Sequence, residues 1–202
     1  MSSRPKLFRD PVHDIIEFDL DDRTESILFD LVNTRAFQRL RRVRQLGFAN
    51  LVYHGAEHSR FSHSLGVFHI GRMMARALSE HLDEERHLEV LCASLLHDIG
   101  HGPFSHAIEA VTSVDHEEYT AQLIEDPSTD VHRILSAVDG SLPRRVARYF
   151  KPRKEFPREW RMLKDIVSSQ LDADRLDYIL RDGKSTGVKI GVYDFERIMS
   201  ML

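Results

Sequence analysis

The chain has 202 residues, of which 42% are apolar and 30% are charged, a composition typical of one globular domain with a substantial core. Its formal net charge of -4 argues against sequence-independent binding of nucleic acid by the whole surface. No apolar run approaches the roughly 18 residues of a transmembrane helix, the first residues lack the apolar core of a signal peptide, and the single cysteine, Cys92, excludes a disulfide framework. We therefore expect a cytoplasmic protein without a membrane segment.

The first part of the chain predicts a short extended segment, two helical stretches and a loop. Residues 8–20 combine turn residues with the apolar stretch 15–18, which predicts a strand or a small hairpin. Between residues 25 and 46 apolar side chains recur near helical spacing, and Asn33-Thr34 interrupts this run and caps its second half. Residues 47–62 carry the glycines and aromatic residues of a loop.

The rest of the chain predicts helices. One helix begins near Ser62 to Ser64, and a second spans about residues 86–99 until Gly100-His-Gly-Pro103 breaks it. Further helices are expected over residues 115–125, 130–138, 160–169, 170–181 and 193–202. The expected fold is therefore all-α, one helical domain over residues 1–202 with a short N-terminal extended or hairpin segment. Because the last helical pattern lacks a clear terminal cap, we expect a C-terminal helical region to be missing.

Three histidines and an aspartate fall within residues 97–106, which read His-Asp-Ile-Gly-His-Gly-Pro-Phe-Ser-His and follow an apolar run. Burying a carboxylate beside an imidazole is costly unless both have partners, and a metal ion is such a partner. The alternative is a surface helix terminus with a solvated ion pair. The segments 58–66 and 171–182 hold further candidate ligands, and together the three segments give the pattern H…HD…D.

The helix that contains Asp174 suits the lining of a polar pocket. At about 100° per residue, one arc of this helix presents Asp174, Arg175, Tyr178 and Asp182, while the adjacent arc is apolar. The alternative is an amphipathic surface helix whose charges face solvent. Arg60 lies about one helical turn before His63, where a guanidinium can bind phosphate oxygens with two parallel hydrogen bonds.

Other histidines are candidates for proton transfer. His101 and His106 flank a glycine-proline turn that can direct them over the pocket. His116 precedes Glu117-Glu118, which indicates a second acid oriented by a carboxylate; the alternative is a solvated helix start. The remaining histidines, including His13 and His58, are expected to be surface or packing residues.

The basic run between Arg35 and Arg44 has several interpretations. A solvated helix face is the usual one, and the functional alternatives are contacts to nucleotide phosphates, a subunit interface or RNA.

The segments 37–41, 45–47, 58–66, 96–106 and 172–182 occur in an order that covers most of residues 6–195. This arrangement resembles the deoxynucleoside triphosphate triphosphohydrolases, the branch of the HD-domain superfamily that contains the animal SAM-and-HD-domain protein and bacterial relatives. The resemblance implies an HD-domain helical bundle and one divalent transition metal, such as manganese, iron, cobalt, nickel or zinc, with magnesium as a further option. The metal ligands that it implies are His63, His97, Asp98 and Asp174.

The resemblance also implies roles around the substrate. The residues expected to contact the triphosphate are Arg60, His101, Arg175 and Tyr178, and those expected near the cleaved bond are His106 and His116. Asp98 is expected to be catalytic as well as a metal ligand. The proton donor would be His116 or His101. Gln45 and Asp182 would hold the 3′-hydroxyl of the deoxyribose, and Tyr178 would crowd its 2′ position.

Two positions and one region depart from the pattern of the family. A phosphate-contacting lysine of the animal enzyme is Arg175 here, and its charge is kept while its geometry changes. Asn33 stands where the animal enzyme reads a regulatory guanine with an aspartate, although Gln38 and Arg41 are retained. The long C-terminal region that completes the base pocket and the oligomer does not fit within this chain.

The primary hypothesis is a metal-dependent phosphohydrolase that cleaves deoxynucleoside triphosphates to deoxynucleoside and triphosphate by attack of water on the α-phosphorus. One alternative is an HD-type nucleotidase or phosphodiesterase with the same metal centre. Another is a nucleotide- or RNA-binding regulatory module with little turnover, which would not need a complete ligand set. The expected partners are a nucleotide substrate, further copies of the chain and a regulatory nucleotide; nucleic acid is left open.

Overall fold

The computed structural model describes residues 4–104 and 106–202, and the side chains of His106, Ala110 and Ile190 lie outside its description. The elements in chain order are β1 (Lys6–Asp10), β2 (Asp14–Phe18), α1 (Arg23–Val32), α2 (Arg35–Gln38), α3 (Arg60–Ala77), α4 (Glu84–Leu96), α5 (His106–Thr112), α6 (His116–Glu125), α7 (Asp130–Val138), α8 (Leu142–Ala147), α9 (Arg161–Val167), α10 (Ala173–Thr186) and α11 (Phe195–Met199). The prediction of an all-α domain with a small N-terminal hairpin is confirmed.

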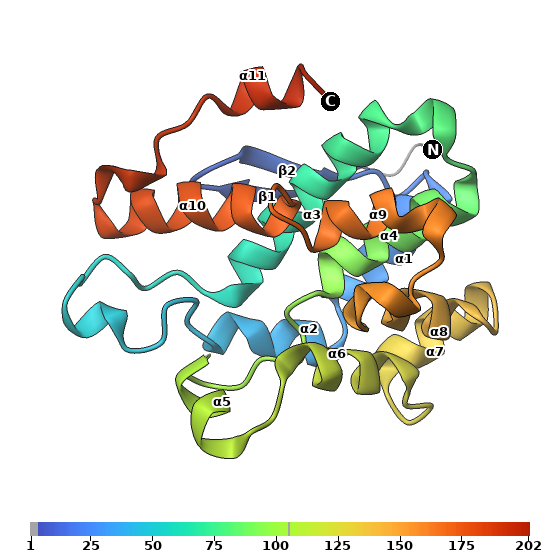
Figure 1. The fold of residues 1–202 in the computed structure, drawn as a ribbon, viewed down its shortest axis with the longest axis horizontal. Helices are drawn as coiled ribbons and strands as arrows, with labels where there is room; N and C mark the ends of the chain where they lie inside the picture. The colour runs from blue at the N-terminus through green and yellow to red at the C-terminus, as the bar shows by residue number, and fades with distance from the viewer. Residues whose placement is uncertain (1–3, 105) are drawn as a thin grey trace.

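Helix α3 is the central element of the bundle, and it packs against α4, α9 and α10 (Figure 1). It begins where the Ser59 side chain accepts a hydrogen bond from the Ser62 backbone N–H, which satisfies one of the free donors of the first turn. Residues on nearly every side of α3 are buried, as expected for a helix that contacts neighbours all round. Its first two turns are therefore held rigidly inside the domain.

The N-terminal hairpin packs on α1 and α3 through one face. Its two strands are antiparallel with Lys6 opposite Phe18, and period-two alternation buries Ile16 and Phe18. The Phe18 ring stacks on Phe68 of α3, with ring centroids 4.9 Å apart. This aromatic contact packs the hairpin against α3.

Several helices begin or end at residues other than those predicted from the sequence. The break at Asn33-Thr34 is confirmed, because the Thr34 side chain caps α2 by accepting from the Phe37 N–H. The predicted helix over residues 86–99 begins earlier, at the Asp83 cap, and ends at Leu96, so that His97 and Asp98 lie in the turn that follows. Helices α5 and α8 were not predicted, since each is too short to show a helical period.

Within the two described ranges, the helices are too short or too polar to cross a membrane. Cys92 lies fully buried on α4, which confirms its role in core packing.

A pH dependence of stability follows from His69 of α3. Burial, together with the nearby charges of His13 and Arg72, lowers the pKa of His69 from 6.5 to about 4. The neutral form is favoured in the folded state, so this stabilisation is complete above the unfolded pKa and is lost as the pH falls from 6.5 towards 4. Between about pH 7 and pH 5, we expect the unaltered protein to lose on the order of 1 kcal/mol more stability than His69→Gln in urea titrations. Equal losses in both proteins would contradict this assignment.

Candidate metal centre and the adjacent cavity

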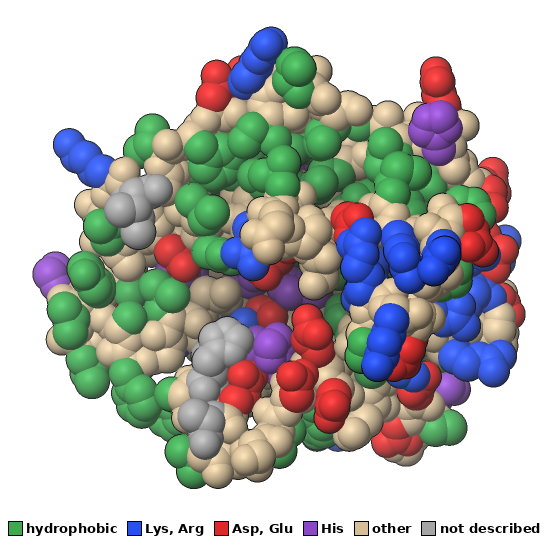
Figure 2. Space-filling view, in the orientation of Figure 1, with side chains coloured by type: hydrophobic (Ala, Val, Ile, Leu, Met, Phe, Trp, Pro, Cys, Tyr) green, Lys and Arg blue, Asp and Glu red, His purple; other side chains and the backbone are tan. Residues whose placement is uncertain are grey.

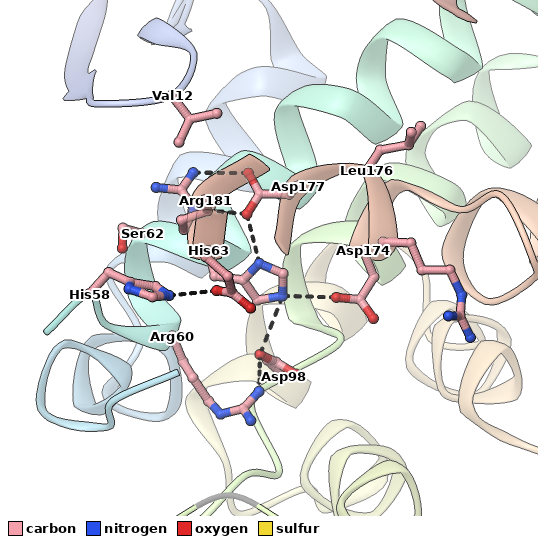
Figure 3. A network of polar contacts seen from close by, with 12 residues as sticks. Val12, His58, Arg60, Ser62, His63, Asp98, Asp174, Leu176, Asp177 and Arg181 are labelled. Atoms are coloured by element: carbon pink, nitrogen blue, oxygen red, sulfur yellow. Dashed lines mark hydrogen bonds and ion pairs between the residues drawn. The ribbon is translucent and has the colours of Figure 1, made fainter. Parts of the chain in front are cut away.

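Four side chains from three distant segments gather inside the bundle, and three of them, His63, His97 and Asp174, lie close enough together to hold one metal ion. His63 comes from the first turn of α3, His97 and Asp98 follow α4 directly, and Asp174 lies in the first turn of α10. The His63 Nε2 is 3.3 Å from His97 Nε2 and 2.9 Å from Asp174 Oδ1, and Asp98 Oδ1 is 3.4 Å from His97 Nε2. Figure 3 shows His63, Asp98 and Asp174 directed at one another.

The hydrogen bonds behind the two imidazoles decide which nitrogens face the cluster. His63 Nδ1 lies 2.7 Å from Asp177 Oδ2, and His97 Nδ1 lies 3.0 Å from the Ser94 carbonyl oxygen. Both partners can only accept, so each Nδ1 carries a proton and donates it. In the neutral tautomer each Nε2 then presents a lone pair to the cluster. Two such nitrogens beside carboxylate oxygens form a donor set that fits a divalent transition metal.

Proton binding competes with a cation at the same nitrogen. Burial disfavours the charged imidazole, yet hydrogen bonds to Asp174 and Asp177 raise the pKa of His63 to about 10. The pKa of Asp174 lies below its usual range because the opposing effect of burial is outweighed by the hydrogen bond to His63. The site therefore favours positive charge strongly, and a metal ion that binds Nε2 near neutral pH displaces a proton.

Asp98 joins this cluster to the phosphate-binding candidates. Its Oδ2 accepts a hydrogen bond from Arg60 Nη1, and its Oδ1 lies 3.5 Å from His101 Nε2. Burial would raise the pKa of Asp98, but the neighbouring charges of His97 and Arg60 hold it well below its usual range. An ionised, buried carboxylate between these groups can orient Arg60 toward the same space that the metal cluster faces.

His101 and His116 form a stacked pair beside Asp98. Their ring centroids are 3.9 Å apart with an interplanar angle of 16°, and Glu109 Oε1 lies 3.3 Å and 2.9 Å from their respective Nδ1 atoms. These three residues are close enough to share a metal ion, but the in-plane lone pairs of parallel rings do not converge on one point. The arrangement suits proton transfer better than metal binding.

The carboxylate that faces His116 is not one that the sequence suggested. Sequence reasoning indicated the adjacent Glu117-Glu118, whereas the structure places Glu109 of α5 there. The position of Glu109 three residues after His106 was a weak signal, because α5 was not recognised as a helix. His106 begins α5, but its side chain lies outside the described part of the structure.

Gly100 lets α6 approach this turn. A Cβ at Gly100 would lie 2.2 Å from the His116 carbonyl oxygen, so a larger residue would push α6 away. Thr120 of α6 then bridges the turn, because its Oγ1 accepts from the Gly100 N–H at 2.9 Å and donates to the His97 carbonyl at 3.1 Å. The position of His116 thus depends on backbone contacts across the metal-binding turn.

One member of the basic run also supports this turn. Arg39 donates to the carbonyl oxygens of His101, at 2.7 Å, and Ile99, so it does not belong to a solvated face. Gln38 and Arg41, the candidates for a regulatory nucleotide, bond to each other at 2.8 Å.

A cavity of about 300 Å³ opens beside the cluster, where Figure 2 shows histidine and acidic side chains at the bottom of a hollow. Nine of the predicted site residues line it: Gln45, Arg60, His97, Asp98, His101, His116, Asp174, Arg175 and Tyr178. The lining also includes Glu117 and Asp172, together with four residues that sequence reasoning missed: Phe150, Val167, Ser168 and Ser169. His63 lies behind His97 and Asp174, fully buried.

Asp182 does not line this cavity. It lies one turn beyond Tyr178 on α10, where its Oδ1 accepts a hydrogen bond of 2.7 Å from His58 Nε2. The His58 side chain is buried, as expected of a packing residue, and it also holds this carboxylate, which the sequence did not indicate. Tyr178, in contrast, lines the cavity, and its hydroxyl accepts a hydrogen bond from Arg175 Nη1 at 3.3 Å.

Comparisons with known proteins agree with this geometry. A family model described as the HD domain matches residues 60–179. The uncharacterized protein YwfO of Bacillus subtilis is 44% identical over 99% of this chain, which covers 45% of that protein. Human SAMHD1, named a deoxynucleoside triphosphate triphosphohydrolase, is 31% identical over 96% of the chain, which covers 35% of it.

A solved structure shares the fold. The phosphohydrolase from Bacteroides thetaiotaomicron superposes with a TM-score of 0.79 at 38% identity, over 98% of this chain and 46% of that one. The chain thus spans less than half the length of each of these relatives. Because the family model matches more than half of the residues and places the predicted ligands His63, His97, Asp98 and Asp174 within its limits, the chain belongs to the HD-domain family.

Proposed function

We propose that this chain is the catalytic core of a metal-dependent phosphohydrolase that cleaves deoxynucleoside triphosphates to deoxynucleoside and triphosphate. The observation that carries the proposal is the convergence of a metal-type donor cluster, Arg60, Arg175 and the His101–His116 pair around one cavity. The membership of the HD-domain family and the similarity to proteins named SAMHD1 support it. The homo-oligomer and the regulatory nucleotide remain predictions.

The residues that would hold the metal are His63, His97, Asp98 and Asp174. A divalent ion bound there supplies Lewis-acid chemistry, in which a phosphoryl oxygen is polarised and the pKa of a bound water is lowered. Arg60 and Arg175 would bind the phosphate oxygens from two sides of the cavity. Arg60 is buried and held by Asp98, so its guanidinium is oriented before substrate arrives, whereas Arg175 is about half exposed and can adjust.

The stacked histidines would move the proton that the leaving oxygen needs. Two cationic rings 3.9 Å apart would repel, so the pair is suited to carry one mobile proton rather than two. Glu109 contacts the Nδ1 atoms of both rings, which directs Nε2 of His101 toward Asp98 and the cavity. A proton held at this pair can be donated to the deoxynucleoside oxygen as its bond to the α-phosphorus breaks.

The sugar would lie against Tyr178. Its ring is bulky enough to fill the space at the 2′ carbon, and Gln45, which also lines the cavity, would bind the 3′-hydroxyl. Asp182 lies outside the lining of this cavity and is held by His58, so its contact with the 3′-hydroxyl remains a prediction from the resemblance.

The test of this function is product analysis. Metal-loaded protein is incubated with deoxynucleoside triphosphates, and the phosphate products are resolved by ion-exchange chromatography. We expect deoxynucleoside and intact triphosphate in equal amounts. Stepwise release of single phosphates would instead identify a nucleotidase, cleavage of a diester alone would identify a phosphodiesterase, and binding without turnover would identify a regulatory module.

The metal assignment predicts a joint loss of metal and activity in Asp98→Ala. Removal of the Asp98 carboxylate takes away one of the two proposed carboxylate ligands and releases Arg60. Metal content by plasma mass spectrometry should fall well below one ion per chain, while Asp126→Ala at the surface should keep full content. Retention of full metal content by Asp98→Ala would refute this ligand set.

The sugar assignment predicts that deoxyribonucleotides are used in preference to ribonucleotides, and that Tyr178→Ala narrows this preference. Loss of the ring opens space for a 2′-hydroxyl, and the expected change in the ratio of specificity constants is roughly 10-fold or more. Tyr178→Phe keeps the ring and should keep the preference. The comparison uses dGTP with GTP and dATP with ATP; equal use of both sugars by the unaltered protein would contradict the assignment.

The proton-transfer assignment predicts that Glu109→Gln lowers kcat by roughly 10- to 100-fold while KM changes little. The amide keeps the size of the side chain but loses the charge that orients both rings. Steady-state kinetics across pH would check it, with Glu118→Gln as the matched control. An unchanged kcat in Glu109→Gln would exclude Glu109 from the proton pathway.

A further inference from the structure

A buried polar network lies behind His63, on the side away from the cavity. At its centre is Asp177 of α10, whose side chain is fully buried and whose Oδ2 accepts the His63 Nδ1 proton at 2.7 Å (Figure 3). Its Oδ1 accepts a hydrogen bond of 2.7 Å from His13 Nε2. Arg181, one turn further on α10, donates Nε to Oδ2 at 2.8 Å and Nη2 to Oδ1 at 2.9 Å. Both oxygens of Asp177 are thus held by donors of fixed position.

The network continues into the turn of the N-terminal hairpin. Arg181 donates to both oxygens of Asp10, at 2.8 Å and 3.2 Å, and Asp10 in turn accepts from the backbone N–H groups of Val12 and His13. The side chain of His13 is only 5% exposed, so the expectation that it is a surface or packing residue misses its role as a hydrogen-bond donor. The hairpin turn is thereby fastened to the helix that carries Asp174.

The network places a buried carboxylate directly behind His63. Asp177 contacts the His63 ring, and Arg181 pairs with both Asp177 and Asp10. Burying ions to hold elements together is an inefficient source of stability, because their desolvation offsets most of the attraction. A carboxylate that accepts from Nδ1 of a metal-type imidazole has another use, since it stabilises positive charge at the far side of the ring.

Helix α3 is shaped to admit Asp177. A Cβ at Gly66 would lie 1.9 Å from Asp177 Oδ1 and 2.5 Å from Arg181 Nη2. Glycine at this position lets the carboxylate approach the backbone of α3 one turn after His63. The sequence of α3 therefore leaves space for this contact as well as supplying the imidazole.

We propose that Asp177 is the outer carboxylate that fixes the tautomer and direction of His63, and that Asp10, His13 and Arg181 are positioning residues that hold Asp177. The N-terminal hairpin is then part of the metal centre, although Asp10, His13 and Arg181 all lie outside residues 60–179 matched by the HD-domain model. This inference rests on the proposed metal-binding function of His63.

The test measures Mn²⁺ affinity of the full chain by competition with a chelator, at a temperature well below the melting point of each variant. We expect Asp177→Asn to bind Mn²⁺ about 10- to 100-fold more weakly, since loss of an outer partner of a metal-bound histidine has effects of this size. His13→Ala and Asp10→Asn should show smaller losses in the same direction. His13→Gln, whose amide can still donate to Asp177, should recover affinity relative to His13→Ala.

The control is Glu25→Gln, which removes a different buried ion pair. Glu25 pairs with Arg72 at 2.9 Å, and Arg72 also binds the Glu17 carbonyl of β2, so this pair also ties the hairpin region to α3. It should lower the melting temperature while leaving Mn²⁺ affinity unchanged. If Mn²⁺ affinity falls in proportion to melting temperature in every variant, Glu25→Gln included, the network only stabilises the fold. That outcome would overturn the proposal.

Two outcomes separate this inference from the proposed function. If the unaltered protein binds no Mn²⁺ in an Asp98-dependent manner, the metal centre itself is refuted and the inference falls with it. If Asp98 is required but folded Asp177→Asn and His13→Ala bind Mn²⁺ as tightly as the unaltered protein, only the positioning role is refuted. Should Asp177→Asn not fold, His13→Ala and its comparison with His13→Gln decide.

Discussion

The structure depends on one constraint, the close approach of two histidine rings. The Nε2 atoms of His63 and His97 lie 3.3 Å apart, and the Nδ1 atom of each ring already donates a hydrogen bond. Neutral rings in this arrangement direct lone pairs at one another and at a carboxylate, which is unfavourable in a buried site without positive charge between them. Either a proton or a metal ion resolves it. The packing of α4 and α10 on α3 brings these groups together. The same three helices therefore form the core of the bundle and create the site that needs a positive charge.

Charge is distributed unevenly on the two sides of this centre. Behind His63 lie the buried carboxylates of Asp177 and Asp10, with Arg181 between them. In front, toward the cavity, lie the guanidinium groups of Arg60 and Arg175. Negative groups behind favour a bound cation, while positive groups in front favour an anionic substrate. This polarity suits the binding of a polyphosphate against a metal ion, and it arises from α10, which contributes residues to both sides.

The turn after α4 is held by side chains rather than by regular structure. Where a helix ends, its last carbonyl groups need partners from elsewhere. Here the Thr120 hydroxyl of α6 donates to the His97 carbonyl, and the Arg39 guanidinium donates to the carbonyls of Ile99 and His101. These contacts fix the backbone that carries His97, Asp98 and His101. They also explain why helices outside the metal cluster matter to it, because each supplies a donor that the turn cannot supply itself.

The sequence by itself determined the helical class and the N-terminal hairpin, and it pointed to the residues that are predicted to hold the metal. Helical periodicity and a compact motif at residues 97–106 are local properties, and they are visible without a fold. His63 and Asp174 could be assigned through the resemblance to a family, since their spacing to His97 is not a compact motif. The arc of α10 predicted from a helical wheel was correct for Asp174, Arg175 and Tyr178, because helix geometry alone sets it.

Only the tertiary structure decided which carboxylate faces which histidine. Glu109 rather than Glu117 or Glu118 contacts His116, because the direction of α5 across the turn depends on packing and not on sequence distance. Asp182 binds His58, and Asp177 binds His13 from 164 positions away. Such pairings depend on how close two elements approach, and residues such as Gly66 and Gly100 control that approach by leaving space rather than by making contacts. A sequence shows which groups need partners, whereas the folded chain decides which partners they have.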